Sequence, residues 1–417
     1  MSAVQDVDDG HDERPALKRA IGFPLLVLYG IGTMVGAGFF ALSGEVAGKA
    51  GTHAPVAFGV AGLLALFSAL AFAEWSSRLP HAGGSARYLE QAFGRRWLSA
   101  IVGWLIITTG VVSAATLVVA TDRFLGDFVD WPDAPAIIAV TLAIGGIAAW
   151  GVREAVGLVV GICVVQIATL MYVAFASFGA PEPVAAGPMT LMPPLAGSAW
   201  ISILSAAFLA FYAFIGFEDM VNMAEETQHA RRNMPWAVVL SLVLTTILYM
   251  FVSTALVLSI PSATLAEAGT PLAEAVRHHG RPAIAAIGIV SILSAVNSAL
   301  VQIVMAARVA YGMANRGYAP GFLATIGRRT QTPWIATALA TLAIALLALG
   351  LELTTLANIT SGVLLLVFAM VNAGLWWTKG LEKDRPSPAA FTLPRSVPLL
   401  GTAVSVSALV FKLVTSL

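Results

Sequence analysis

The sequence predicts an all-α polytopic membrane protein of about eleven transmembrane helices, built as an inverted five-plus-five helix repeat with discontinuous helices 1 and 6. Of its 417 residues, 58% are hydrophobic and 11% are charged, and the mean hydropathy is +0.84, which lies outside the range of soluble globular proteins. Apolar runs long enough to cross about 30 Å of hydrocarbon recur along the chain. Two of them, about 180 residues apart, are interrupted near the middle.

The first interruption is the glycine-rich segment 30–40, GIGTMVGAGFF, inside an apolar run from Ile21 to Val46. Each glycine in a helix interior costs roughly 1 kcal/mol relative to alanine, so this spacing of glycines favours a broken helix. Broken backbone is tolerated at membrane depth only where it is buried in protein or lines a wet cavity. Its free amide and carbonyl groups suit the two charges of a zwitterion, so the segment is a candidate binding site for a small polar molecule.

The second interruption is the segment 210–226, AFYAFIGFEDMVNMAEE. A helix of apolar residues reaches Gly216 and then the acid pair Glu218 and Asp219, where the bilayer centre is expected. A carboxylate at that depth costs several kcal/mol on insertion scales, so it should face the protein interior or water. Two broken helices in corresponding halves of a chain indicate a secondary transporter with inverted repeats.

We expect eleven spans, and prolines in the first turn or so of seven of them support the boundaries. Their approximate bounds are 21–45, 55–79, 97–127, 134–150, 154–178, 199–226, 235–260, 282–314, 333–350, 353–378 and 396–415. Five spans precede the second interruption, so helices 1–5 and 6–10 have opposite orientations. This divides the chain into a cytoplasmic tail (1–19), a first repeat (20–180), a second repeat (198–380) and an additional helix 11 (395–417).

The basic residues predict the orientation in the plasma membrane. With the amino terminus in the cytoplasm, 18 of the 23 Lys and Arg residues fall on the inner side, a clear positive-inside signal over short loops. An odd number of spans then places the carboxyl terminus outside. The acidic first 20 residues do not resemble a cleaved signal peptide, and Cys163, the single cysteine, supports neither a disulfide nor a cysteine metal site.

Two connections are distinctive. The segment from Arg78 to Gly94 is too polar to span the membrane and is expected to be a re-entrant or surface segment on the inner side. The proline-rich connection from Gly179 to Ser198 contains no basic residue and is expected to be an irregular external loop that joins the two halves.

Six motifs follow one another along the chain: GTMVGAGFFALSGEVAG (32–48), FAEW (72–75), LPHAGGSARYLEQAFG (79–94), WGVREAV (150–156), FIGFEDMVNMAEETQHARRNMP (214–235) and RVAYGMANRGYAP (308–320). In this order they resemble the amino acid permeases of the amino acid, polyamine and organocation superfamily. The resemblance implies the five-plus-five inverted fold, transport of amino acids or related amines, and either proton coupling or substrate exchange.

The substrate is expected between the two interruptions. We expect the amides of Gly36, Ala37 and Gly38 to bind its carboxylate, because the helix that starts there points its positive dipole end at the site. As in related permeases, free carbonyls would receive its ammonium group, and these belong to Thr33, Met34, Phe214 and Ile215. The alternative is that the glycines only allow close helix packing.

Aromatic and acidic residues flank this site. Tyr212 matches a family position that often holds an aromatic gate, and Phe39 could close the pocket with it or simply pack. Glu218 matches an acid that follows the helix 6 break in many relatives, and we expect it to carry a coupling proton unless it makes only a structural hydrogen bond. Asp219 lies beside it and has no assigned role.

Acids at the inner helix ends could form a cytoplasmic gate with nearby arginines. These acids are Glu74, Glu225 and Glu226, and a structural or solvated role is the simpler interpretation, since exposed ion pairs contribute only about 0 to 1 kcal/mol.

The coupling ion stays open between a proton and sodium. Proton-coupled relatives often carry a lysine in helix 5, but the span from Ala155 to Phe178 has none. Oxygens on helix 8 could help to bind sodium, although serines in helices often bond locally, and they belong to Ser291, Ser294, Asn297 and Ser298.

The sequence thus predicts an amino acid permease for a neutral, apolar substrate, because no other acid lies near the depth of Glu218 and Asp219 to receive a basic side chain. We expect no enzymatic activity, no metal site and no cofactor beyond the coupling ion. The expected partners are a small-molecule amino acid and the lipid bilayer, with no nucleic acid, and the oligomeric state is left open. A polyamine or amine exchanger and an amino acid sensor without net transport are the alternatives.

Overall fold

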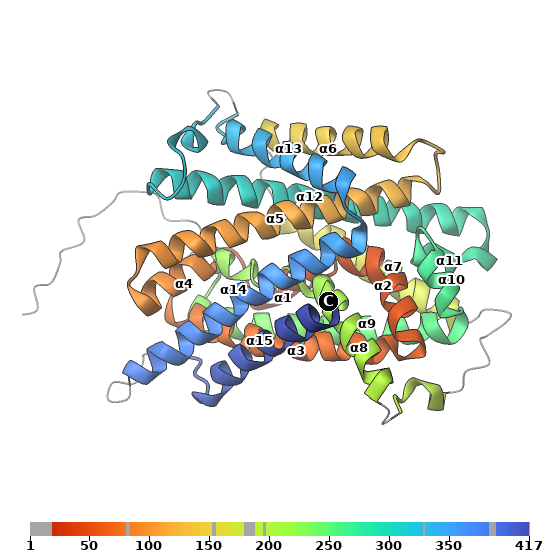
Figure 1. Ribbon diagram of the computed structural model, residues 1–417, viewed down its shortest axis with the longest axis horizontal. Helices are drawn as coiled ribbons and strands as arrows, with labels where there is room; N and C mark the ends of the chain where they lie inside the picture. Colours follow the sequence, from red (N-terminus) through yellow and green to blue (C-terminus); the bar gives the residue numbers. More distant parts are fainter. Residues whose placement is uncertain are drawn as a thin grey trace, which may run out of the picture.

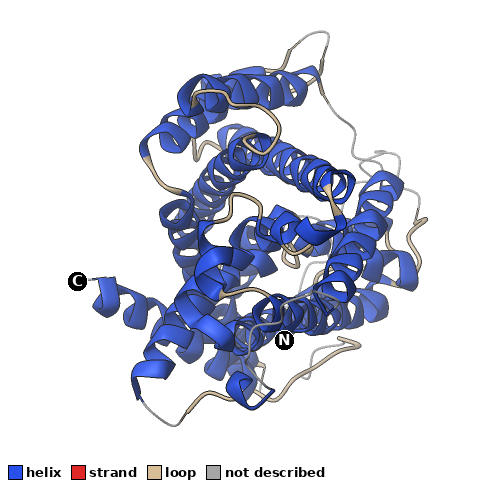
Figure 2. Cartoon of the chain, turned by 90° about the vertical axis from the view of Figure 1, so that its right-hand side faces the viewer, coloured by secondary structure: helices blue, strands red, loops and turns tan. Residues whose placement is uncertain are grey.

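The computed structural model describes residues 19–80, 84–151, 156–178, 188–194, 197–327, 330–382 and 389–416. Within these ranges the regular structure is helical (Figure 1 and Figure 2), and the β contact is one parallel bridge between Ile21 and Thr227. The predicted cytoplasmic tail, apart from residue 19, and most of the predicted external loop at 179–198 lie outside the described residues.

The helices of the first half follow the predicted spans closely. They are α1 (Phe23–Met34), α2 (Ala37–Ala50), the 3-10 turn η1 (Gly51–His53), α3 (Ala54–Arg78), α4 (Gly84–Phe93), α5 (Arg96–Leu125), α6 (Asp133–Trp150) and α7 (Val156–Phe178). The helix α4 is the predicted inner segment, and it buries one face, which includes Tyr88 and Leu89.

The second half begins after the short 3-10 helix η2 (Pro188–Leu191). Its spans are α8 (Gly197–Ala210), continued by η3 (Phe211–Phe214) and η4 (Met220–Glu226), then α9 (Ala230–Ser259), α12 (Arg281–Asn315), α13 (Trp334–Gly350), α14 (Leu353–Leu381) and α15 (Ser396–Ser416). Four short elements lie in the connections, and these are α10 (Ser262–Glu267), α11 (Pro271–Glu274), η5 (Arg277–His279) and η6 (Gly321–Ala324).

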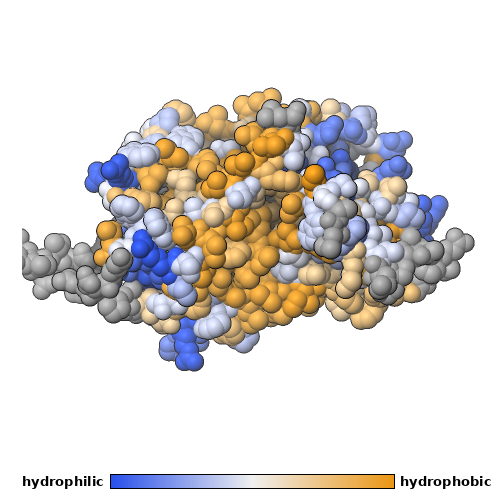
Figure 3. All heavy atoms as spheres, turned by 60° about the horizontal axis from the view of Figure 1, so that its bottom comes forward, coloured by the Kyte–Doolittle hydropathy of each residue, from blue (hydrophilic) through white to orange (hydrophobic). Residues whose placement is uncertain are grey.

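Nine continuous helical stretches in the described residues are long and apolar enough to cross a membrane. One of them, Ala37–Arg78, is divided into α2 and α3 by a turn at Gly51, whose φ of +60° suits glycine. Counting α2 and α3 separately, and adding the two shorter apolar helices α1 and α13, gives twelve apolar helices in the described part of the chain. Because α1 and α2 together form one broken span, the number of spans is the predicted eleven. The prediction of a polytopic all-α membrane protein is confirmed. An apolar belt flanked by polar ends is visible on the surface in Figure 3.

One predicted boundary is wrong by about a turn and a half. We expected the seventh span to begin at Pro235, but α9 begins at Ala230, with Pro235 inside it. A proline lacks the amide that would bond to the carbonyl four residues earlier. That carbonyl belongs to Arg231, and it accepts a hydrogen bond from the Ser77 hydroxyl of α3 at 2.9 Å. The tertiary contact therefore supplies the bond that Pro235 cannot make.

Helices from equivalent positions of the two halves pack on each other. Thus α3 packs along α9, α5 along α12 and α6 along α13, and α2 contacts α8 and η3. The cross-contacts are also equivalent, because α1 lies on α9 as α8 lies on α3. Figure 1 shows α5, α6, α12 and α13 together on one side of the molecule and α3, α8 and α15 on the other. This pairing is what two inverted repeats produce, and it brings the broken first helices of both halves to the centre.

Candidate functional site

The first break separates α1 from α2. The helix α1 ends at Met34, the ψ angle of Val35 is +44°, and Gly36 is extended, with φ −82° and ψ −163°. The helix α2 then begins at Ala37. Because the first amides of a helix have no acceptor within it, the amides of Ala37 and Gly38 point into the break. This is where we expected donors for a carboxylate.

The second break is much longer than the first. After Ala210 the chain forms the 3-10 turn η3, Ile215 is extended, and Gly216 takes a φ of +128° that only glycine adopts readily. The 3-10 helix η4 follows, and α-helix resumes only at Ala230. We expected a single interruption near Gly216 in a span that continued to residue 226, so the unwinding is more extensive than the sequence suggested.

The two breaks touch each other. The Thr33 hydroxyl lies 2.9 Å from the carbonyl oxygen of Gly30 and 3.2 Å from that of Gly216, and its single proton can bond to either one. A methyl group on Gly216 would lie 2.5 Å from the Thr33 carbonyl oxygen, and one on Gly38 would lie 2.9 Å from Cα of Ala213. Neither glycine could therefore carry a side chain without separating the breaks. The predicted residues of the two segments are brought together.

Tyr249 of α9 links both breaks, and sequence reasoning missed it. Its buried hydroxyl donates to the carbonyl of Met34 at 2.8 Å and lies 3.0 Å from that of Ala213. The Met34 carbonyl, which we expected to bind the ammonium group, thus already accepts a hydrogen bond from Tyr249. The available signal was a tyrosine in an apolar span, since a buried phenol needs a hydrogen-bond partner.

The aromatic side chains around Tyr249 form a packed cluster. The Phe39 ring is completely buried and stacks on Tyr249 with centroids 4.4 Å apart, and Phe58 and Phe214 pack against the same ring. Tyr212 is also buried, and its hydroxyl lies 3.0 Å from that of Ser113 on α5. In this conformation Phe39 and Tyr212 are packing residues, and their role as gates stays a prediction.

Glu218 lies beside a small cavity at the second break. Its Oε2 accepts a hydrogen bond from the Gly216 amide at 2.9 Å, which closes the turn. The cavity has a volume of about 140 Å³, and its polar lining includes Glu218, Asp219, Asn222, Thr109 and Gln302. The remaining wall comes from Gly84 and Ser85 at the start of α4 and from five apolar residues, Ile106, Met305, Val309, Leu364 and Val367. Of the predicted site residues, Glu218 alone appears on the wall of this cavity.

Helix α7 faces the first break without a positive charge. Cys163 lies against Gly32, so closely that a methyl group there would be 2.8 Å from the cysteine Cβ. Gln166 donates to the Ser294 hydroxyl of α12 at 2.6 Å, and Ser298 is the nearest side chain to Gly36. The Ser291 hydroxyl bonds locally to the Ile287 carbonyl at 2.9 Å. The four residues suggested for sodium lie on the eighth span, which is α12. Of these, Ser294 and Ser298 lie near α7 and the first break.

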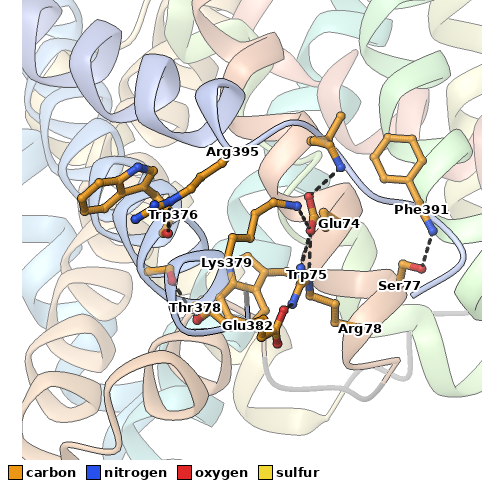
Figure 4. A network of polar contacts seen from close by, with 12 residues as sticks. Glu74, Trp75, Ser77, Arg78, Trp376, Thr378, Lys379, Glu382, Phe391 and Arg395 are labelled. Atoms are coloured by element: carbon orange, nitrogen blue, oxygen red, sulfur yellow. Dashed lines mark hydrogen bonds and ion pairs between the residues drawn. The ribbon is translucent and has the colours of Figure 1, made fainter. Parts of the chain in front are cut away.

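Glu74 is buried in a network on the arginine-rich side, shown in Figure 4. Its carboxylate forms ion pairs with Arg78 at 2.6 Å and with Lys379 of α14 at 2.5 Å, and it accepts a hydrogen bond from the Leu393 amide at 3.0 Å. Arg78 also forms an ion pair with Glu382 at 2.7 Å. These contacts join α3, α14 and the segment before α15. Glu74 thus has a structural role here. Its predicted gating role is untested, as is that of Glu225 in η4.

Comparisons with known proteins agree with this geometry. The family model described as amino acid permease matches residues 21–416. The chain belongs to the amino acid permease family. Members of this family are transporters and not enzymes, as we expected.

Similar relatives come from bacteria and plants. The chain is 28% identical to the branched-chain amino acid permease of Bacillus subtilis, over 96% of this chain and 89% of that one. It is 29% identical to an uncharacterised transporter of Mycobacterium tuberculosis, over 94% and 86%. It is 28% identical to a cationic amino acid transporter of Arabidopsis thaliana, over 94% and 69%. Together with the family match, these relatives support transport of amino acids across a membrane.

Proposed function

We propose that this permease carries a neutral, apolar amino acid across the plasma membrane by alternating access, with a proton bound by Glu218 as the coupling ion. The observation that carries the proposal is the contact between the two helix breaks. The amides at the start of α2 suit a carboxylate, and the unwound backbone of the second break suits an ammonium group. Separation of the breaks around the substrate would open the site.

The cavity beside Glu218 favours a substrate with an apolar side chain of modest size. Its wall is mostly apolar, and 140 Å³ corresponds to the liquid volume of about four or five water molecules. The carboxylate of Glu218 forms no ion pair with another described residue, and a carboxylate inside a membrane needs a positive partner. A proton supplies it when the substrate is neutral. Transport of branched-chain amino acids by the Bacillus subtilis relative, as its name states, is in keeping with this choice.

A cationic amino acid is the second candidate, because the carboxylate of Glu218 on the cavity wall could instead bind a basic side chain. Some relatives are named cationic amino acid transporters, including those of Arabidopsis thaliana. In this case the substrate itself neutralises Glu218, and a proton is not required.

A binding screen followed by flux measurements separates the candidates. Thermal unfolding of the purified protein with each amino acid identifies the ligand, since a ligand that binds only the folded state raises its stability. Uptake of leucine and lysine is then measured in proteoliposomes with and without an imposed proton gradient. Gradient-driven leucine uptake supports the proposal, and gradient-independent lysine uptake supports the second candidate. Putrescine that outcompetes both would indicate an amine exchanger, and binding without flux would indicate a sensor.

A further inference from the structure

A basic groove lies between the start of α1 and the start of α9, and we refer to it as the α1/α9 groove. It has a volume of about 840 Å³ and contains four basic side chains, Arg19, His229, Arg231 and Arg232, and the rings of Phe23 and Trp236. It opens on the arginine-rich side of the molecule, which the positive-inside rule assigns to the cytoplasm. The basic residues come from two segments that are more than 200 residues apart in the sequence.

The charge of the α1/α9 groove is not neutralised by the protein part that the structure describes. Arg19, Arg231 and Arg232 form no ion pair with any described residue, and no described acid lines the groove. Glu225 and Glu226 precede α9 in the chain but are not part of the lining.

A second groove on the same side behaves differently. It has a volume of about 660 Å³ and contains Arg87, Arg96 and Arg316, but also Glu90, which pairs with Arg316 at 3.6 Å. A groove on this basic side of the molecule can therefore contain an acid that pairs with one of its arginines. Both grooves carry excess positive charge, but of the two only the α1/α9 groove has no acid among its described lining residues.

The backbone and the side chains of the α1/α9 groove both suit a phosphate group. The helix α9 has 30 residues and begins at Ala230, so its first amides and its positive dipole end lie at the groove. Arginine guanidinium groups bind phosphate oxygens in pairs of parallel hydrogen bonds. His229, with a φ of +50°, turns the chain into this helix.

The apolar part of the groove indicates a lipid. Trp236 follows Arg232 by one helical turn, so both side chains lie on the same face of α9. The Trp236 ring is 56% exposed and packs edge-on against Phe391, and exposed tryptophans are typical of the membrane interface. A ligand that contacts both residues needs a phosphate group beside an apolar chain.

We propose that the α1/α9 groove binds the phosphate headgroup of an anionic phospholipid from the adjoining leaflet. Here α1 and the second break are held together by backbone bonds, with Ile21 donating to Glu226 at 3.0 Å and Gln228 donating to Ile21 at 2.9 Å. The lipid phosphate bridges Arg19 before α1 to Arg231 and Arg232 in α9. It therefore stabilises the conformation in which these ends are joined, and anionic lipid shifts the conformational equilibrium of the permease.

The test compares two matched pairs of arginines on the same side of the membrane. Arg231→Gln with Arg232→Gln removes two charges from the α1/α9 groove, and Arg95→Gln with Arg96→Gln removes two exposed charges elsewhere. Thermal unfolding of the full-length protein in detergent is measured against added phosphatidylglycerol and against phosphatidylcholine with the same acyl chains. We expect phosphatidylglycerol to stabilise the unmodified protein and the R95Q/R96Q control by several degrees more than phosphatidylcholine does.

For R231Q/R232Q the apparent affinity for phosphatidylglycerol should fall about 10- to 30-fold, since each basic residue near an anionic surface contributes about 1 kcal/mol. An equal fall in both variants, or in neither, would overturn the proposal. Stabilisation by inorganic phosphate or glycerol 3-phosphate as large as that by the lipid would overturn the assignment to a phospholipid. If R231Q/R232Q does not fold, Arg19→Gln tests the same groove from its other wall.

Discussion

The two breaks at the centre of the molecule differ in length and in chemistry. The first occupies two residues between two α-helices, and it presents the start of α2. The second runs from Phe211 to the start of α9, consists of 3-10 helix, turns and the bridge residue Thr227, and carries a carboxylate, Glu218. A short break with a helix start suits a substrate anion, whereas a long unwound segment with an acid suits a cation or proton. Under the proposed function, each half would therefore contribute a separate charge function to one site.

The largest effect is expected from Gly216→Ala, which changes the backbone of the second break. Its φ of +128° is strained for alanine, at about 1–3 kcal/mol, and the added methyl would meet the Thr33 carbonyl. We expect uptake to fall at least 100-fold, together with a lower unfolding temperature. Gly146→Ala in α6 is the control, since nothing lies within 4 Å of its added methyl. Normal uptake by G216A would show that the breaks need not touch.

Gly38→Ala tests the first break and is expected to have the next largest effect. The methyl would press on Ala213 and Tyr212 and displace the start of α2 from the second break, without backbone strain of its own. Uptake should fall about tenfold, mainly through a higher KM. Initial rates over a range of substrate concentrations separate KM from maximal rate. A change in maximal rate alone would argue against a binding role for this end of α2.

Tyr249→Phe tests what the two breaks share. It removes the hydroxyl that donates to the Met34 carbonyl and lies 3.0 Å from the Ala213 carbonyl, but it keeps the stacking on Phe39. Hydrogen bonds between membrane helices contribute about 0.6 to 2 kcal/mol, so we expect a modest loss of thermal stability and a several-fold lower uptake. The exposed Tyr172→Phe is a matched control. Identical melting temperatures for Y249F and the unmodified protein would mean that the bridge is not stabilising.

Glu218→Gln should have the smallest effect on substrate affinity and the clearest effect on coupling. Glutamine keeps the shape and a hydrogen-bond acceptor for the Gly216 amide, but it cannot gain or lose a proton. We expect substrate binding within a few-fold of the unmodified value and uptake that no longer depends on pH. The measurement is uptake across a pH series, with binding followed by thermal shift. Unchanged pH dependence would remove Glu218 from the coupling role.

Much of the architecture could be predicted from composition and spacing. Long apolar runs, initial prolines and the arginine distribution are local properties, and they located the eleven spans because a lipid environment requires every backbone group in a helix to bond within it. The glycines at 30–38 and the acids at 218–219 also revealed both breaks. The error at Pro235 arose because its partner carbonyl bonds to Ser77, which is distant in sequence.

The contacts that make the breaks into a site were decided by the tertiary structure. Tyr249, Ser113 and Thr109 reach the centre from helices whose sequences give no sign of it, and Lys379, the partner of Glu74 on α14, lies about 300 residues away. Likewise, Arg19 meets Arg231 and Arg232 only when α1 packs beside α9. The sequence by itself determined which segments cross the membrane and where they break, since those depend on local hydrophobicity and backbone freedom. Only the folded chain decided which groups face each other there, because that depends on packing between distant helices.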